Sequence, residues 1–371
     1  MKKVLCVLLL IISLLTTFVS CDISSMFGKH GVIYKKSECG TYAKVVGYRG
    51  TAKEVVIDAE YEGLPVTTID ARAFSHCDKL KSIEIPETVT NIGDGAFTSC
   101  YQLSSIVIPD GVTSIGDSAF WFCSSLHSIV IPNNVTSIGR YAFAHSGIES
   151  VLIHDNITNI EDFAFSGCTN LNSVIIGNGV TRIGEGSFSD CYNLNSVTIG
   201  NSVDVIRKHA FSECTSLTSI IIPDNVIIIE DFSFSHCKNL NSVIIGNGVT
   251  KIGANSFSDC YKLNSVVIGD SVADVGYCAF GYSKITSLIL PEGITNIGYG
   301  AFRWCTYLNS VVIPDSVTSI EDCAFESCSS LTSINFKGTT EQWNAITKGD
   351  NWKKKLSATT VICSDGIINL T

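Results

Sequence analysis

Basic residues are few and scattered in this sequence. Outside Lys353, Lys354 and Lys355 there is no run of Lys and Arg, and the formal net charge of the 371 residues is -10. A nucleic-acid-binding surface needs a basic patch or stripe, so we expect neither DNA nor RNA as a partner. Charged residues of both signs make up only 16% of the chain, against 45% apolar residues. This balance excludes disorder and allows a long buried core.

Motifs of catalysis and cofactor binding are also missing. The sequence contains no G-x-S-x-G nucleophile elbow, no phosphate-binding P-loop and no Cys-x-x-Cys pair. We therefore expect no enzymatic activity, no bound metal and no cofactor.

Long apolar runs are limited to one, from Val4 to about Leu15. This run is shorter than the roughly 20 residues that cross a bilayer. It follows Lys2 and Lys3 and precedes "TTFVSC", the order of a secretory signal. We predict that residues 1–20 are a signal peptide and that the protein is exported.

The end of this segment, "FVSC" at residues 18–21, resembles the lipobox of bacterial lipoproteins, with Phe18 where that family prefers Leu. The resemblance implies lipidation of Cys21, which would hold the protein by acyl chains at a membrane surface. The expected location is the bacterial cell surface or a periplasm-facing membrane. An ordinary cleaved signal is the alternative.

A phenylalanine recurs at a nearly fixed interval of 23 residues, with two steps of 22, and an Ile or Val lies five residues before each Phe. A period of roughly 20–50 residues is typical of solenoids and propellers. A coil this short cannot enclose its own apolar side chains, so equivalent residues must stack from coil to coil. The repeated residues are Phe74, Phe97, Phe120, Phe143, Phe165, Phe188, Phe211, Phe234, Phe257, Phe280, Phe302 and Phe325.

Each repeat also carries a short β-branched run after the Phe, such as residues 173–176, closed by Pro or Gly. Such runs indicate strands, which lie parallel about 4.8 Å apart in stacked coils. We predict a β-rich solenoid of about twelve coils over residues 55–336, with a parallel sheet face and short helical or 3₁₀ turns around the Phe. Residues 21–54 would form an N-terminal anchor segment and cap, and residues 337–371 a C-terminal cap.

The repeat columns "IPxxVTxIGxxAFxxCxxLxSI" resemble the leucine-rich repeat of the BspA-like (Treponema-type) family of bacterial and protist surface proteins. The flanking stretches "GYRGTAKEVVIDAEYEGLPVTTID" and "FKGTTEQWNAITKGDNW" resemble the opening repeat and the closing segment of that family. The resemblance implies a leucine-rich-repeat solenoid that adheres to host matrix or to other cells. Trp343 and Trp352 are then expected to pack in the core of the C-terminal cap.

Ten of the sixteen cysteines lie three residues after the repeated Phe, and Ser146 and Ser283 replace them in the two coils whose next step is 22. Loss of the thiol together with one residue indicates that the Cys fills a particular corner as a small buried hydrophobe. Parallel side chains disfavour disulfide geometry, and a row along the axis does not gather metal ligands around one point. We expect free buried thiols, with some disulfides or metal binding as alternatives.

In each strand the two core positions are apolar, so the residue between them points outward. A solvent-facing row is usually polar, yet nine of these twelve outward residues are aliphatic. Exposed apolar patches often mark binding surfaces, although strand propensity alone would favour the same residues. A Ser column beside this row is expected to form a hydroxyl ladder between strands. The predicted protein-binding face consists of Val107, Val130, Leu152, Ile175, Ile221, Ile244, Val267, Ile289 and Val312.

Residues 168–203 and 237–272 have nearly the same amino-acid sequence, and they lie three coils apart. Such block duplication multiplies a surface and does not build a unique pocket, which favours binding over catalysis. We predict an exported protein that binds protein partners, such as host matrix or other cell-surface proteins, through its sheet face. The alternative is a self-associating structural component of the cell envelope.

Overall fold

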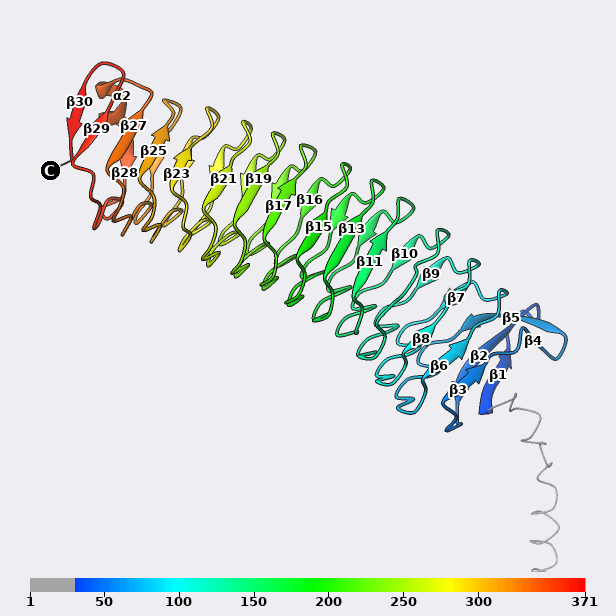
Figure 1. The fold of residues 1–371 in the computed structure, drawn as a ribbon. Helices are drawn as coiled ribbons and strands as arrows, with labels where there is room; N and C mark the ends of the chain where they lie inside the picture. The colour runs from blue at the N-terminus through cyan, green and yellow to red at the C-terminus, as the bar shows by residue number, and fades with distance from the viewer. Residues whose placement is uncertain (1–30, 371) are drawn as a thin grey trace, which may run out of the picture.

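The computed structural model describes residues 31–370, so the predicted signal peptide and Cys21 lie outside the described residues. The chain forms one elongated solenoid whose coils stack along a single axis (Figure 1), which confirms the predicted fold. It has about 14 turns of about 23 residues, not twelve. The difference arises because both caps add strands to the stacked rows: β2 pairs in parallel with β5, and β27 with β29.

Two rows of parallel strands run along the solenoid. The upstream sheet contains the strands that precede the repeated Phe, most of them two residues long, with an outward residue followed by a buried Ile or Val. Its hydrogen-bonded runs are long, since nine strands from β12 to β28 follow one another without a break. Its strands are β1 (Val32–Lys36), β2 (Ala43–Tyr48), β4 (Glu60–Tyr61), β5 (Leu64–Ile69), β7 (Asn91–Ile92), β9 (Ser114–Ile115), β10 (Ser137–Ile138), β12 (Asn159–Ile160), β14 (Arg182–Ile183), β16 (Val205–Ile206), β18 (Ile228–Ile229), β20 (Lys251–Ile252), β22 (Asp274–Val275), β24 (Asn296–Ile297), β26 (Ser319–Ile320) and β28 (Thr347–Lys348).

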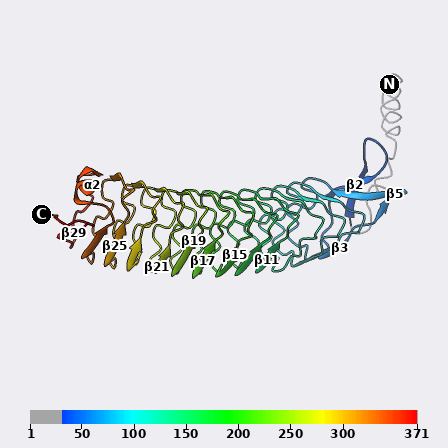
Figure 2. The same cartoon turned by 90° about the horizontal axis from the view of Figure 1, so that it is seen from above.

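The downstream sheet contains the strands that follow the Phe, and it lies along one long side of the solenoid (Figure 2). It is divided into hydrogen-bonded groups of three, three, three and five strands, and residues 128–131 contribute no strand to it. Its strands are β3 (Glu54–Val56), β6 (Ser82–Glu84), β8 (Ser105–Ile106), β11 (Ser150–Ile153), β13 (Ser173–Ile176), β15 (Ser196–Thr198), β17 (Ser219–Ile222), β19 (Ser242–Ile245), β21 (Ser265–Val267), β23 (Ser287–Ile289), β25 (Ser310–Ile313), β27 (Ser333–Phe336), β29 (Thr360–Ile362) and β30 (Ile367–Asn369).

The core is a continuous column of phenylalanine rings. All twelve repeated Phe side chains are fully buried, and neighbouring rings stack with centroids 5.1 to 5.6 Å apart. Tyr48 covers the first ring of the column, and Trp352 covers the last ring in an edge-on contact. Trp343, on the short helix α2 (Thr340–Ala345), packs edge-on against Trp352. Both tryptophans are buried, as predicted for cap residues.

The segment around each Phe is not helical, which corrects the expected helical or 3₁₀ turns. In all twelve coils the residues two before and two after the Phe have positive φ, as at Ser118 (55°) and Phe122 (59°). Left-handed residues at this spacing interrupt a right-handed helix. The segment is instead a series of turns: Cys123 N–H donates to Phe120 O within the coil (3.2 Å), whereas Phe120 N–H donates to Ala142 O of the next coil (2.7 Å). These turns therefore join neighbouring coils as the strands do.

Candidate binding surface

The predicted face lies on the outward side of the downstream sheet. Eight of its nine side chains are exposed, Val107 by 75%, Val130 by 80% and Ile289 by 68%, while Val312 is half-buried. The residues on either side of each, such as Ile220 and Ile222 beside Ile221, are buried, except for the half-buried Val266 beside Val267. The alternation predicted from the sequence is thus present, and we call these nine residues the aliphatic ribbon.

Wherever neighbouring strands of this sheet pair, they are in register, so the ribbon residues of those strands lie side by side. Leu152 pairs with Ile175 across β11 and β13, and Ile221 pairs with Ile244 across β17 and β19. Thr198 interrupts the line at the boundary between β15 and β17. The ribbon therefore has two stretches, four coils from Val107 to Ile175 and five coils from Ile221 to Val312.

Beyond Glu84 and Asn335, the two ends of this line carry apolar residues that the sequence prediction missed. Val56, paired with Glu84, is 43% exposed, and Ile362, paired with Asn335, is 48% exposed. Their sequences depart from the repeat, but the run "EVVI" at residues 54–57 has the same alternation and could have indicated Val56.

The Ser column lies beside the ribbon, yet it is not the expected hydroxyl ladder. Within the described part of the chain, no hydrogen bond joins two serines of this column, although Ser150 and Ser173 are paired neighbours. Hydroxyl contacts between coils occur elsewhere: Thr113 Oγ1 donates to Thr90 O (3.2 Å) next to the upstream sheet, and Ser166 and Ser189 bond in the interior (2.9 Å). The Ser column is therefore a polar border of the ribbon, with its hydroxyls exposed or partly exposed to solvent.

A shallow groove of about 590 Å³ separates the ribbon from the turns at the carboxyl ends of its strands. Leu152 and Ile175 line one side, and Asp155 and Asn178 line the other. Gly177 and Gly200 form its floor, where neighbouring coils approach closely: a Cβ on Gly200 would lie 2.2 Å from Gly177 O. Asp155 Oδ1 accepts from Asn178 N–H (2.7 Å), and Asn178 Oδ1 accepts from Asn201 N–H (2.9 Å). These carboxylate and amide side chains thus tie successive turns together.

The cysteine column is unlinked, as expected, and nine of its ten thiols are buried, whereas Cys77 is partly exposed. All fourteen cysteines within residues 31–370 are free, and the column thiols donate to the Phe carbonyl of the preceding coil, as Cys123 Sγ does to Phe97 O (3.2 Å). Burial raises the pKa of Cys123 and of Cys237 to about 12. These thiols are held protonated in the interior and are structural.

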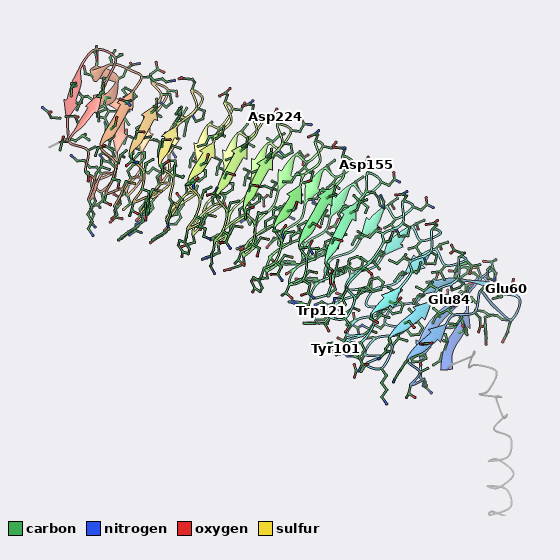
Figure 3. The ribbon with its side chains drawn as sticks, viewed as in Figure 1. Glu60, Glu84, Tyr101, Trp121, Asp155 and Asp224 are labelled. Carbon is green, nitrogen blue, oxygen red and sulfur yellow. The ribbon has the colours of Figure 1, made fainter. Side chains whose placement is uncertain are left out.

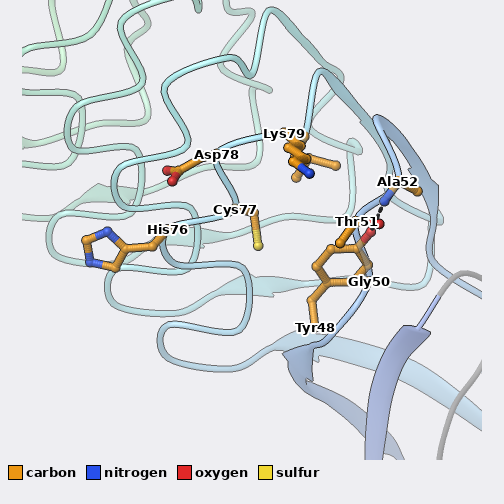
Figure 4. Close-up of a pocket in the computed structure, with 9 residues that line it drawn as sticks. Tyr48, Gly50, Thr51, Ala52, His76, Cys77, Asp78 and Lys79 are labelled. Carbon is orange, nitrogen blue, oxygen red and sulfur yellow. Dashed lines mark hydrogen bonds between the residues drawn. The ribbon is translucent and has the colours of Figure 1, made fainter.

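Two cysteines near the N-terminal end are accessible. Cys77 lines a cavity of about 220 Å³ between the cap and the first coil, together with Tyr48, whose hydroxyl accepts from Ala52 N–H (Figure 4). Cys39 is exposed on the β1–β2 hairpin, and hydrogen bonds from Ser37 and Thr41 lower its pKa to about 7. Residues 31–370 hold no group of three or more His, Cys, Asp and Glu side chains that could bind a metal.

Over the described range, no helix has both the length and the apolar character that crossing a bilayer would take.

Comparison with known proteins identifies repeat proteins of one kind. The sequence profile of BspA type leucine-rich repeat regions matches in six copies, over residues 62–172, 136–260 and 227–347. The structure is similar to that of a leucine-rich repeat protein from Bacteroides ovatus, at 27% identity and a TM-score of 0.55, covering 87% of this chain and 99% of that chain. It is also similar to a leucine rich cell surface protein from Faecalibacterium prausnitzii, at 28% identity and a TM-score of 0.45, covering 86% and 97% of the two chains. No curated protein matched the chain.

Proposed function

Because the chain belongs to the BspA-type leucine-rich repeat family, we propose that it is an exported surface protein that binds protein partners through the aliphatic ribbon, in adhesion or in contact with other cells. Solenoids of this family are generally binding scaffolds without enzymatic activity, and we propose no catalysis here. Family membership supports a protein-interaction or adhesion role at the cell surface. The ribbon is the part of this chain that we assign to that role.

One observation carries this assignment. In coil after coil the aliphatic side chains of the ribbon face solvent, and eight of the nine are exposed. Strand propensity does not account for them, because the outward row of the upstream sheet forms strands with polar residues in ten of twelve coils. That row is Thr68, Asn91, Ser114, Ser137, Asn159, Arg182, Val205, Ile228, Lys251, Asp274, Asn296 and Ser319. An exposed apolar surface of this length is typical of a protein–protein interface.

A capture experiment with matched variants tests the proposal. The ribbon variant replaces Ile175, Ile221, Ile244 and Ile289 by Lys, and the control variant replaces Asn159, Val205, Ile228 and Asn296 in the outward row of the upstream sheet by Lys. Surface proteins captured by the wild-type protein and the control variant, but lost with the ribbon variant, are the expected result. A capture pattern that is the same for all three proteins would remove the ribbon as the binding face.

Self-association is the second outcome that this design can detect. Sedimentation of the soluble mature protein measures its oligomeric state directly. Dimers or filaments that dissociate in the ribbon variant but not in the control variant would identify the partner as a second copy and the protein as a structural component of the cell envelope. A wild-type monomer favours a different protein as the partner.

We also propose that Cys21 carries the lipid that holds the protein at the bacterial cell surface or at a periplasm-facing membrane. The support is the sequence alone, the lipobox-like residues 18–21 after a short apolar run. Metabolic labelling with an alkyne fatty acid is expected to mark the wild-type protein and not Cys21→Ser. Labelling that persists in the variant would place the lipid at another residue, and a wild type without label would leave an ordinary cleaved signal.

A further inference from the structure

A row of acidic and amide side chains borders the ribbon on one side only. It lies at the turn after each downstream strand, with Asp155 and Asp224 along the same long edge of the solenoid (Figure 3). Seven of its eleven residues are carboxylates, four are Asn, and none is Lys or Arg. We call this row the carboxylate edge: Glu87, Asp110, Asn133, Asp155, Asn178, Asn201, Asp224, Asn247, Asp270, Glu292 and Asp315.

The charges of this edge mostly lack a counter-ion, and two of its seven carboxylates, Asp155 and Asp224, are held in place by a backbone hydrogen bond. All eleven side chains are exposed. Asp224 Oδ1 accepts a hydrogen bond from Asn247 N–H (2.7 Å), and Asp155 Oδ1 accepts the equivalent bond from Asn178 N–H three coils earlier. Along residues 31–370, the single ion pair of this row joins Glu292 to Lys337. The other six carboxylates therefore present their charge to whatever covers the ribbon.

The opposite border of the ribbon is nearly neutral. The residues just before the Ser column are Asn or Thr in the eight coils from residue 172 to residue 332. Charge appears there only at the N-terminal end, as Lys81 and Glu149, and Glu149 lies 3.8 Å from His127. The ribbon thus has one acidic side and one uncharged side.

We propose that the partner recognised by this face carries a line of aliphatic side chains with a row of Lys or Arg beside it, and that these cations face the carboxylate edge. This inference rests on the proposed function of the ribbon. The groove shared by Leu152, Ile175 and Asp155 places apolar and acidic groups within one contact surface. A partner that dehydrates the ribbon also shields the edge from water, so an uncharged or acidic partner leaves carboxylates without compensation.

The same asymmetry disfavours one form of self-pairing. If two copies met ribbon to ribbon about a two-fold axis with their solenoids antiparallel, each carboxylate edge would face the other. Like charges in juxtaposition at an interface oppose binding. Residues 31–370 present no row of cations that could match the edge, so the geometry points to a different, basic protein surface as the occupant.

A panel of three peptides tests the charge of the partner directly. Each is a stapled amphipathic helix of about 18 residues, about 27 Å long, which is comparable with five coils at about 4.8 Å spacing. The three share one Leu stripe and differ in the residue beside it, which is Lys, Gln or Glu. For the full-length protein, we expect the Lys peptide to bind about tenfold more tightly than the Gln peptide and the Glu peptide to bind most weakly. The difference should largely vanish in 1 M salt, where the Debye length is about 3 Å.

Asp→Asn variants show which carboxylates cause the preference for the Lys peptide. Asn already occupies four positions of the edge, and Asn178 and Asn247 accept the same backbone hydrogen bonds as Asp155 and Asp224, so these substitutions preserve the fold. The edge variant replaces Asp110, Asp155, Asp224 and Asp270, and its control makes the same charge change beside the upstream sheet at Asp94, Asp117, Asp274 and Asp322. We expect about a tenfold loss of affinity for the Lys peptide in the edge variant alone.

Three results would overturn the inference: equal affinity for the three peptides, no binding of the Lys peptide, or an equal loss in the control variant. The ribbon variant distinguishes these from failure of the proposed function. If the three peptides bind the wild type with equal affinity and none binds the ribbon variant, the ribbon stays the binding face and only the proposal of a basic partner is removed. A Lys peptide that still binds the ribbon variant would remove the ribbon itself.

Discussion

The upstream and downstream sheets are built from the same coils, yet their outward faces differ in composition. Both bury an aliphatic residue from every coil, for example Ile229 on the upstream side and Ile222 on the downstream side. Outward residues of the upstream sheet find partners within the chain: Ser319 Oγ donates to Asn296 Oδ1 of the preceding coil (2.6 Å). The aliphatic ribbon of the downstream sheet has no such contacts to make. Since one coil geometry accepts either kind of residue, stacking does not dictate the ribbon.

The two sheets also differ in continuity. The upstream sheet keeps its strand pairing through nine coils from β12 to β28, whereas the downstream sheet breaks between β15 and β17 and again between β21 and β23. At these breaks the first inward residue, Val197 or Val266, is only half-buried. The downstream sheet, which carries the exposed ribbon, is therefore the less regular of the two. This irregularity fits a surface whose residues serve binding as well as the stacking of the coils.

The largest expected effect concerns the cysteine turns that join the two sheets. If the sheets form one body, Cys237 stays protonated and inaccessible until the coils unfold, whereas Cys39 with its pKa near 7 is partly thiolate at neutral pH. We expect iodoacetamide at pH 7 to alkylate Cys39 at least about 10³-fold faster than Cys237, as mapped by mass spectrometry. Comparable rates in the native protein would show that the turns open without global unfolding and that the sheets are not one unit.

A smaller effect is expected from the core that both sheets share. Phe211→Ala removes a fully buried ring between stacked neighbours and should lower the free energy of unfolding by about 3–5 kcal/mol. Phe232→Ala, at an exposed ring that stacks on His209, is the control and should cost less than about 1 kcal/mol. Urea unfolding measures both. Equal losses would mean that the ring column is not the main stabilising element.

The smallest expected effect is a difference in stability between substitutions on the inward and the outward side of a single strand. Ile222→Ala should cost about 2–4 kcal/mol, because the side chain is buried, whereas Ile221→Ala should change stability by no more than about 0.5 kcal/mol. Ile229→Ala gives the corresponding loss for the upstream sheet in the same coil. If Ile221→Ala proved as destabilising as Ile222→Ala, the ribbon would belong to the core and would not be a free binding surface.

Much of this structure could be predicted because the repeat supplies twelve copies of each position. Inward and outward residues of the downstream strands, the buried thiols and the cap tryptophans all follow from apolar positions that recur in register. Val312 is the one ribbon residue that is half-buried. The repeat does not extend to the ends of the solenoid. There the exposed residues Val56 and Ile362 lie beyond the ribbon in segments whose sequence departs from the repeat.

The turn conformation could not be predicted, for a specific physical reason. A left-handed backbone is usually signalled by Gly, but Gly occupies only four of these positions, Gly95, Gly167, Gly186 and Gly300. Residues as different as Phe122, His145 and Asp190 adopt the same positive φ. Hydrogen bonds to the next coil hold them there, and such bonds exist only once the coils have stacked.

The sequence by itself determined the period, the stacking of the Phe column and the side of each downstream strand that faces the core, because burial of apolar side chains follows directly from their spacing. Only the tertiary structure decided the left-handed turns, the breaks in the downstream sheet and the carboxylate edge beside the ribbon. These features depend on contacts between residues about one coil apart, and their geometry is set when neighbouring coils pack against each other.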